Sequence, residues 1–172
     1  MTHPINLVKM QFKILLLIGR DDTIYPKIIE RLIKMTFDVF LNFDGDCHEA
    51  IEFYASVFKL EMPERIMTYG QAPGVTVPDN AKNRIIYACL PIFGCNVMFS
   101  DCFPDSGYVK GTNIALTLGT DDADEIKRIY TALSDGGSVN MELGKTFFSE
   151  LFGMVTDKFG ITWQLSLTPL DS

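Results

Sequence analysis

Histidine is scarce in this chain of 172 residues, which holds only His3 and His48. A Ser-His-Asp or Cys-His nucleophile system would have to use His48, which follows Cys47 at an expected helix start. Neighbouring residues on a helix point about 100° apart, because the helix has about 3.6 residues per turn. We therefore interpret the Cys47–His48 pair as incidental, and the sequence assigns no catalytic residue.

The chain also has no C-x-x-C pair among its four cysteines and no long hydrophobic run. Its most apolar stretch, residues 11–19, is shorter than the roughly 20 residues that a membrane-spanning helix needs. Charged residues 20–22 follow this stretch directly, where a signal peptide would have a small-residue cleavage site. We therefore expect reduced thiols, no membrane partner and a cytoplasmic location.

Basic residues are outnumbered, with 15 Lys and Arg against 22 Asp and Glu and a net charge of −7. A phosphate backbone needs a basic face, so this balance disfavours nucleic acid and anionic membranes as partners. No glycine-rich loop follows an expected strand in the way that a dinucleotide or phosphate site requires. We expect no cofactor.

The charge changes sign along the chain. Residues 1–34 hold six basic and three acidic side chains, so the remaining residues carry a net charge of −10. This step marks a boundary near Met35. We interpret residues 1–34 as an N-terminal appendage with a buried strand and an amphipathic helix. Alternatively, Met35 is the biological start and the appendage does not belong to the native protein.

From residue 36 onward the pattern predicts one strand, one helix and three further strands. Residues 36–43 alternate between apolar and polar side chains, which is typical of a half-buried strand. Asp46 and Glu49 form a D-x-x-E pattern that predicts a capping box at a helix start. The three later strands are expected near residues 61–69, 84–91 and 95–101.

The second half repeats this plan. Residues 112–119 predict a strand, and Asp122 and Glu125 predict a second capping box. Three strands are expected near residues 139–147, 152–157 and 161–167. An offset of 75 residues superposes the first strands and helices, and an offset of 66 superposes the last strands.

The repeat predicts an α+β fold of two tandem βαβββ modules, with boundaries at residues 35–103 and 104–172. One helix covers only one face of a four-stranded mixed sheet. The uncovered faces of two modules side by side would form a shared cup, lined by the strand positions that point away from the helices.

The sequence also resembles the vicinal-oxygen-chelate superfamily, which includes glyoxalase I, ring-cleaving dioxygenases and the fosfomycin- and bleomycin-resistance proteins. The closest resemblance is to its PhnB-like branch, and it extends over residues 36–168, about four fifths of the chain. The matching stretches are residues 41–54, 97–101, 112–118 and 145–148 and, most specifically, F-G-M-V-T-D-K-F-G-I-T-W at residues 152–163.

The resemblance implies four inward positions that hold a divalent ion in the metal enzymes of the superfamily. In this chain they are Asp38 and Asn113 on the first strands and Met98 and Gln164 on the last strands. Imidazole and carboxylate are the good ligands for Zn²⁺, Ni²⁺ or Fe²⁺, and only Asp38 offers one. We therefore expect no metal here. We expect Asp38, Asn113 and Gln164 to orient a small ligand, with Phe40 and Met98 against its apolar parts. Alternatively, these residues satisfy one another in a tight seam.

The leading hypothesis from the resemblance is a PhnB-like homodimer that binds a small molecule in a metal-free pocket between paired modules. One alternative is a metal-dependent lyase or dioxygenase of the same superfamily. Another is a resistance protein that sequesters a drug or toxin. The PhnB-like branch also bears the name of a methyltransferase, but no glycine-rich loop is present to hold a methyl donor.

Overall fold

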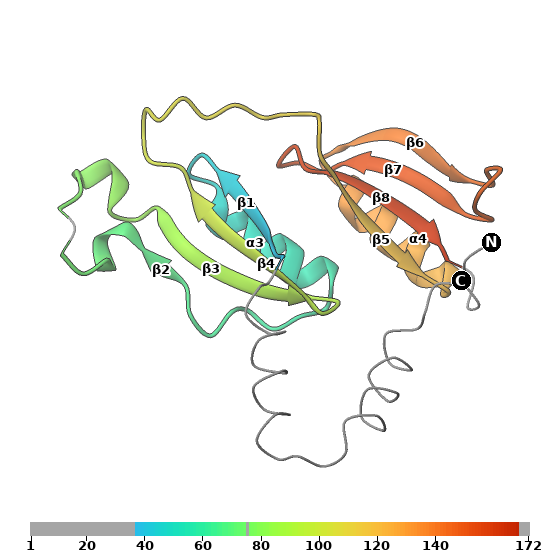
Figure 1. Ribbon diagram of the computed structural model, residues 1–172, viewed down its shortest axis with the longest axis horizontal. Helices are drawn as coiled ribbons and strands as arrows, with labels where there is room; N and C mark the ends of the chain where they lie inside the picture. The colour runs from blue at the N-terminus through green and yellow to red at the C-terminus, as the bar shows by residue number, and fades with distance from the viewer. Residues whose placement is uncertain (1–36, 75, 169–172) are drawn as a thin grey trace, which may run out of the picture. The chain divides into compact units, whose positions relative to one another are not determined.

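Two copies of a strand–helix–three-strand unit follow each other along the chain (Figure 1). The computed structural model describes residues 37–74 and 76–168, and the appendage predicted at residues 1–34 lies outside them. The first unit comprises β1 (Val39–Phe43), α3 (Cys47–Val57), β2 (Met67–Thr68), β3 (Ile85–Ile92) and β4 (Cys95–Asp101). The second comprises β5 (Ala115–Thr120), α4 (Ala123–Ser134), β6 (Ser138–Gly144), β7 (Phe152–Thr156) and β8 (Thr162–Leu167).

Each unit forms its own four-stranded mixed sheet. The strand orders are β1-β4-β3-β2 and β5-β8-β7-β6. In both sheets the first strand pairs in parallel with the last, and the other pairs are antiparallel. The α+β fold of two βαβββ modules is therefore confirmed. The boundary predicted between residues 103 and 104 falls in the segment between β4 and β5.

Several strands are shorter than the pattern predicted, β2 and β5 among them. Of residues 61–69 only Met67 and Thr68 pair with β3, and the short helices η1 (Tyr69–Gln71) and η2 (Asp79–Ala81) follow. Pro63 lies in this stretch and has no N–H group to donate to a sheet ladder. The strand expected at residues 112–119 starts at Ala115, which leaves the side chain of Ile114 74% exposed.

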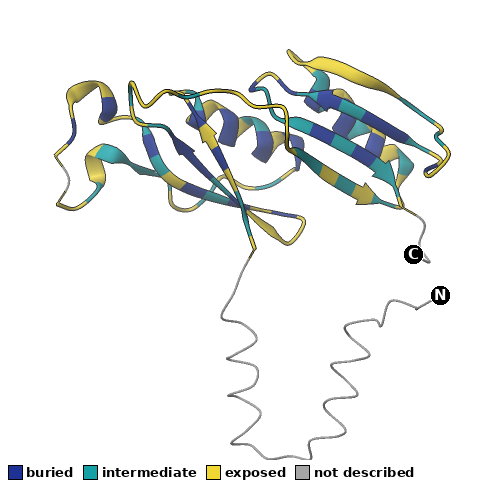
Figure 2. Ribbon diagram, turned by 45° about the horizontal axis from the view of Figure 1, so that its top comes forward, coloured by how far each residue is buried: buried dark blue, intermediate teal, exposed yellow. Residues whose placement is uncertain are grey.

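The helices cover one face of each sheet with apolar side chains (Figure 2). Helix α3 buries Ile51 and Tyr54, and α4 buries Ile126 and Leu133. None of the helices in the described residues is long and apolar enough to cross a membrane.

Helix α3 starts differently from the prediction. Asp46 occupies the N-cap position, but its side chain makes no capping hydrogen bond. Instead the buried carboxylate of Asp101, at the end of β4, accepts backbone hydrogen bonds from Gly45 at 2.7 Å, Cys47 at 3.1 Å and Ile85 at 2.8 Å. The capping box predicted at Asp46 and Glu49 is therefore wrong, because the Asp46 carboxylate accepts from the N–H group of Asp44 instead, and Asp101 accepts from the first helical residue, Cys47.

Helix α4 starts as predicted at its N-cap. The carboxylate of Asp122 accepts hydrogen bonds from the backbone N–H groups of Asp124 at 2.9 Å and Glu125 at 3.1 Å. The side chain of Glu125 does not complete a capping box, since it binds Arg128 at 2.7 Å. Arg128 also donates a 2.8 Å hydrogen bond to the carbonyl of Val57, so this pair joins the start of α4 to the end of α3.

The two units share one apolar core around Asp157, which directly follows β7. Its buried carboxylate accepts hydrogen bonds from the hydroxyl of Tyr54 on α3 at 2.6 Å and from the indole N–H of Trp163 at 2.8 Å. It also accepts two backbone N–H groups, of Phe159 and Ile161, both at 3.0 Å. The rings of Tyr54 and Trp163 lie 5.6 Å apart. Trp163 is therefore a core residue and belongs to the junction of the two units.

The Glu125–Arg128 pair leads to a pH-dependent prediction. Hydrogen bonding to Arg128 lowers the pKa of Glu125 from 4.5 to about 2. A carboxylate with a lowered pKa stabilises the fold above its unfolded pKa and loses this contribution as the pH falls through the folded value. We expect Glu125→Gln to cost about 1 kcal/mol at pH 7, since the pair is partly exposed, and the gap to wild type to close between pH 4.5 and 2. Urea denaturation at stepped pH measures this, and an equal gap at pH 7 and pH 2 would contradict it.

Candidate functional site

The face of the first sheet that α3 leaves uncovered carries aromatic, sulfur and polar side chains. Alternation along the strands puts Leu41 and Phe43 on the side of α3 and the intervening residues on the other side. Phe40 of β1 lies beside Met98 of β4, which lies beside Cys89 of β3. We call this surface the first open face; its residues are Asp38, Phe40, Asn42, Tyr87, Cys89, Asn96, Met98 and Ser100.

Two side-chain hydrogen bonds order the polar groups of the first open face. The amide of Asn96 donates to Oδ1 of Asp38 at 3.3 Å. The hydroxyl of Ser100 donates to the side-chain carbonyl of Asn42 at 3.2 Å. Among the described residues, Asn96 is the hydrogen-bond donor to the Asp38 carboxylate.

The corresponding face of the second sheet is rich in hydroxyl and amide groups. Thr117 of β5 lies beside Gln164 of β8, which lies beside Met154 of β7. The Thr117 hydroxyl donates to Oε1 of Gln164 at 3.4 Å, and the hydroxyls of Thr156 and Thr162 lie 3.1 Å apart. We call this surface the second open face; its residues are Ala115, Thr117, Met141, Phe152, Met154, Thr156, Thr162, Gln164 and Ser166.

Strand register shows which positions of the two sheets are equivalent. Phe40 pairs with Met98, and Thr117 pairs with Gln164. Met98 and Gln164 are 66 residues apart, as the repeat predicted, whereas Phe40 and Thr117 are 77 apart. The offset of 75 for the first strands is therefore two residues short. Thr117 is the structural counterpart of Phe40.

The structure brings together some of the predicted ligand-binding residues and not others. Asp38, Phe40 and Met98 lie on the first open face, and Gln164 lies on the second. Asn113 does not join Gln164, since it is exposed, precedes β5 and stands four positions before Thr117. Thr117 and Asn96 were missed. Their alternation in the strands is visible in the sequence, but the cross-strand register that pairs them is not.

These residues do not fit the divalent ion that the superfamily resemblance implies. Asp38 is the one carboxylate among the residues of the two open faces, and its nearest described partner is an amide donor. Met98 offers a soft thioether and Gln164 a neutral amide oxygen, whereas Zn²⁺, Ni²⁺ and Fe²⁺ favour imidazole and carboxylate. Within residues 37–74 and 76–168, no three His, Cys, Asp or Glu side chains are grouped so that they could hold an ion. We derive no chemistry through a metal here.

Cys47 and His48 do not form a nucleophile pair. Cys47 is fully buried, and burial together with the carboxylates of Asp101 and Asp46 raises the pKa of its thiol. A reactive cysteine needs a lowered pKa and solvent access. His48 lies on the exposed face of α3, 3.6 Å from Glu52. The four cysteines are all unbridged.

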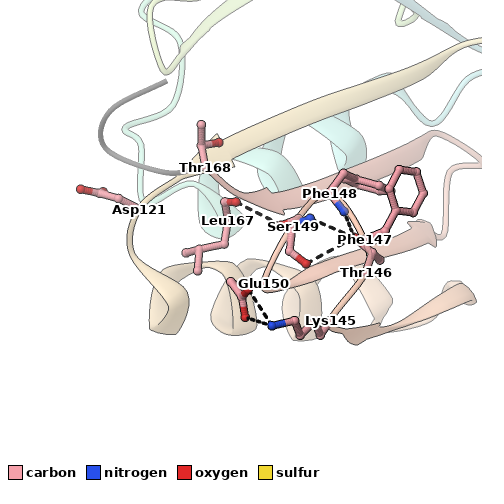
Figure 3. A pocket seen from close by; sticks show the side chains of 9 residues that line it. All are labelled: Asp121, Lys145, Thr146, Phe147, Phe148, Ser149, Glu150, Leu167 and Thr168. Carbon is pink, nitrogen blue, oxygen red and sulfur yellow. Dashed lines mark hydrogen bonds and ion pairs between the residues drawn. The ribbon is translucent and has the colours of Figure 1, made fainter.

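A hollow of about 560 Å³ lies at the end of the second sheet (Figure 3). The β6–β7 loop lines it with Lys145, which binds Glu150 at 2.8 Å, and with the exposed Phe147 and Phe148. None of the five predicted ligand-binding residues lines this hollow.

Comparison with known proteins identifies the family. A family model described as 3-demethylubiquinone-9 3-methyltransferase matches residues 35–166. Protein YjdN of Escherichia coli (strain K12) is 31% identical over 145 residues, covering 77% of this chain and 95% of YjdN. The chain belongs to this family.

Solved structures agree with the assignment to this PhnB-like family. Protein PA1353 of Pseudomonas aeruginosa is 32% identical with a TM-score of 0.70, covering 78% of this chain and 98% of PA1353. A PhnB protein of Bacillus cereus is 28% identical with a TM-score of 0.66, covering 78% of this chain and all of the other. The fosfomycin resistance protein FosX of Listeria monocytogenes is 11% identical with a TM-score of 0.54 over 81% of this chain and 97% of FosX, and so shares the fold alone. The family lies in the glyoxalase, or vicinal-oxygen-chelate, superfamily.

Residues 152–163, the most specific stretch of the PhnB-like resemblance, mainly stabilise the fold. It contains Asp157 and Trp163 of the shared core. It also contains Gly153, where an added Cβ would lie 2.9 Å from the ring of Tyr130 and from a methyl group of Leu143. This stretch therefore holds the two units together, while the second open face lies on the alternate positions of the same strands.

Proposed function

We propose that this PhnB-like protein binds a small molecule, without a metal ion, between open faces that two copies of the chain bring together. The observation that carries the proposal is the exposure of large apolar side chains on these faces. Phe40 is 46% exposed, Met141 41% and Tyr87 39%. Large apolar patches on a protein surface mark interaction sites, because their burial is favourable.

The contacts between the two units of one chain leave these faces uncovered. The units meet through Tyr54, Trp163 and Arg128, which lie on the helix side of the sheets. A second copy of the chain would cover the open faces and close a cup. The cup would then combine the Phe40–Met98 pair and Asp38 with the Thr117–Gln164 pair. In such a site a few polar groups orient the ligand and apolar groups supply burial.

The unbridged cysteines support a cytoplasmic setting for this function, where thiols stay reduced.

A methyltransferase activity, which the family name states, has no comparable support. The connections from β1 to α3 and from β5 to α4 span residues 44–46 and 121–122 and contain a single glycine, Gly45.

Native mass spectrometry of the full chain tests the dimer. We expect a dimer, and we expect Phe40→Asp to weaken it at least about tenfold, because the change places a charge in a desolvated apolar contact. Ser56→Asp, on the exposed side of α3, adds the same charge away from both open faces and is the matched control. A monomeric wild-type protein, or equal dissociation constants for both variants, would contradict the pairing.

Native mass spectrometry combined with metal analysis distinguishes a metal-free binding site from the metal-dependent enzyme of the alternative hypothesis. We expect a co-purifying small molecule, and its loss in Asp38→Ala and Gln164→Ala with the dimer retained. We expect Ni²⁺, Zn²⁺, Mn²⁺ and Fe²⁺ each to shift the melting temperature by less than about 1 °C, since a tight ligand of the folded state would raise it. A stoichiometric ion that Asp38→Ala releases would favour a lyase or dioxygenase instead.

A further inference from the structure

The named residues of the two open faces carry a single charge. On the first open face Asp38 carries the one carboxylate among the named residues, and on the second open face the named residues carry no charge at all. Neither set includes a lysine or arginine. An anionic ligand would therefore meet no countercharge from these strands and would lose its hydration, which is costly in a partly desolvated site.

The Asp38 carboxylate is placed to receive a cation. Asn96 donates to only one of its oxygens, at 3.3 Å, and the described residues supply no cation to the other. Asp38 directly precedes β1 and Phe40 stands two residues further on, and the bond from Asn96, two residues before Met98 on β4, places Asp38 on the same face as Phe40 and Met98. Once a second copy covers this face, the carboxylate is left in a drier environment, where an opposite charge stabilises it most.

In the proposed dimer, the second open face would lie opposite the first and would supply neutral hydrogen-bonding groups. Thr117, Gln164, Thr156 and Thr162 offer hydroxyl and amide groups that already bind one another in pairs. Such groups can accept or donate without requiring a charged partner. Met154 beside Gln164 adds a polarisable thioether that suits an apolar or aromatic surface.

From this arrangement we infer that the ligand is a small cationic amphiphile, with its cation at Asp38 and its apolar part against Phe40 and Met98. The inference rests on the proposed function, because it names the ligand class of that same site. It also makes Asp38 the specificity-determining residue. Phosphorylated and carboxylate ligands would be rejected.

Three isosteric probes test the inference: phenethylammonium, phenethyl alcohol and phenylacetate. Binding is followed in the full chain by NMR of labelled methionine methyl groups, since Met98 and Met154 lie on the two open faces. We expect phenethylammonium to bind at least about tenfold more tightly than phenylacetate, with the alcohol between them. The preference should shrink as the salt concentration rises.

Asp38→Asn and Asp79→Asn separate the inference from the proposed function. Asp38→Asn keeps the shape of the side chain and should reduce the preference for the ammonium probe to less than about twofold. Asp79→Asn removes an equal charge from an exposed position and should leave the preference intact. If all three probes bind wild type equally, or phenylacetate binds best, the ligand class is wrong and small-molecule binding stands. If no probe perturbs either methionine, the proposed function is contradicted with it.

Discussion

Replacing Asp157 by alanine is expected to lower the free energy of unfolding by about 4 kcal/mol, a large part of the 5–15 kcal/mol that typically stabilises a domain. The reason is that four donors, three of them in buried bonds, lose their acceptor together: the Tyr54 hydroxyl, the Trp163 indole and the backbone N–H groups of Phe159 and, part-buried, Ile161. Each buried donor left without a partner costs about 1–3 kcal/mol. Part of this cost is recovered where water enters the space that the side chain leaves.

Urea denaturation followed by far-UV circular dichroism measures this loss, and the fluorescence of the single tryptophan, Trp163, reports on the site itself. Asp79→Ala is the matched control, because Asp79 forms a surface ion pair with Lys82 and should cost less than about 0.5 kcal/mol. Tyr54→Phe removes one donor and should cost about 1–2 kcal/mol, so it remains measurable if Asp157→Ala does not fold. A loss below 1 kcal/mol in Asp157→Ala would show that the carboxylate does not join the two units.

Local patterns in the sequence predicted the units but not the long-range contacts that complete them. The D-x-x-E pattern occurs at Asp46 and again at Asp122, and only Asp122 caps its helix with its own side chain. At α3 the acceptor is Asp101, which lies 54 residues from Cys47 in sequence. The capping pattern involves four consecutive residues. It therefore cannot predict a carboxylate from a distant strand that the sheet places at the helix start.

The candidate site was predicted less completely, for a related reason. Alternation placed Phe40 on the same face as Asp38, the family resemblance supplied Met98, and β1 and β4 pair Phe40 with Met98 directly. The choice of Asn113 depended on the 75-residue offset, whereas hydrogen-bond register aligns the first strands at 77. A shift of two residues keeps every side chain on the same face, so alternation cannot detect it. Only the pairing of β5 with β8 shows that Thr117 stands opposite Gln164.

Replacing Asp101 by alanine is expected to cost about 3 kcal/mol, whereas replacing Asp46 should cost less than about 1 kcal/mol. Asp101 accepts the N–H groups of Gly45, Cys47 and Ile85, and it lies in the core with 2% of its surface exposed. Within the described part of the chain, the Asp46 carboxylate accepts one N–H group, that of Asp44, at 3.2 Å and on the surface. Both carboxylates lie at the start of α3, so the comparison separates the contribution of the distant strand from that of the N-cap residue.

Amide hydrogen exchange shows which part of the chain loses stability in Asp101→Ala, and by how much. In Asp101→Ala the amides of Gly45, Cys47 and Ile85 should exchange much faster, because they lose their acceptor and the first turn of α3 opens more readily. The first turn of α4 should keep its protection, since Asp122 caps it independently. If Asp46→Ala instead costs as much as Asp101→Ala, the start of α3 depends on its own N-cap side chain. The carboxylate at the end of β4 would then be only a neighbour of the helix.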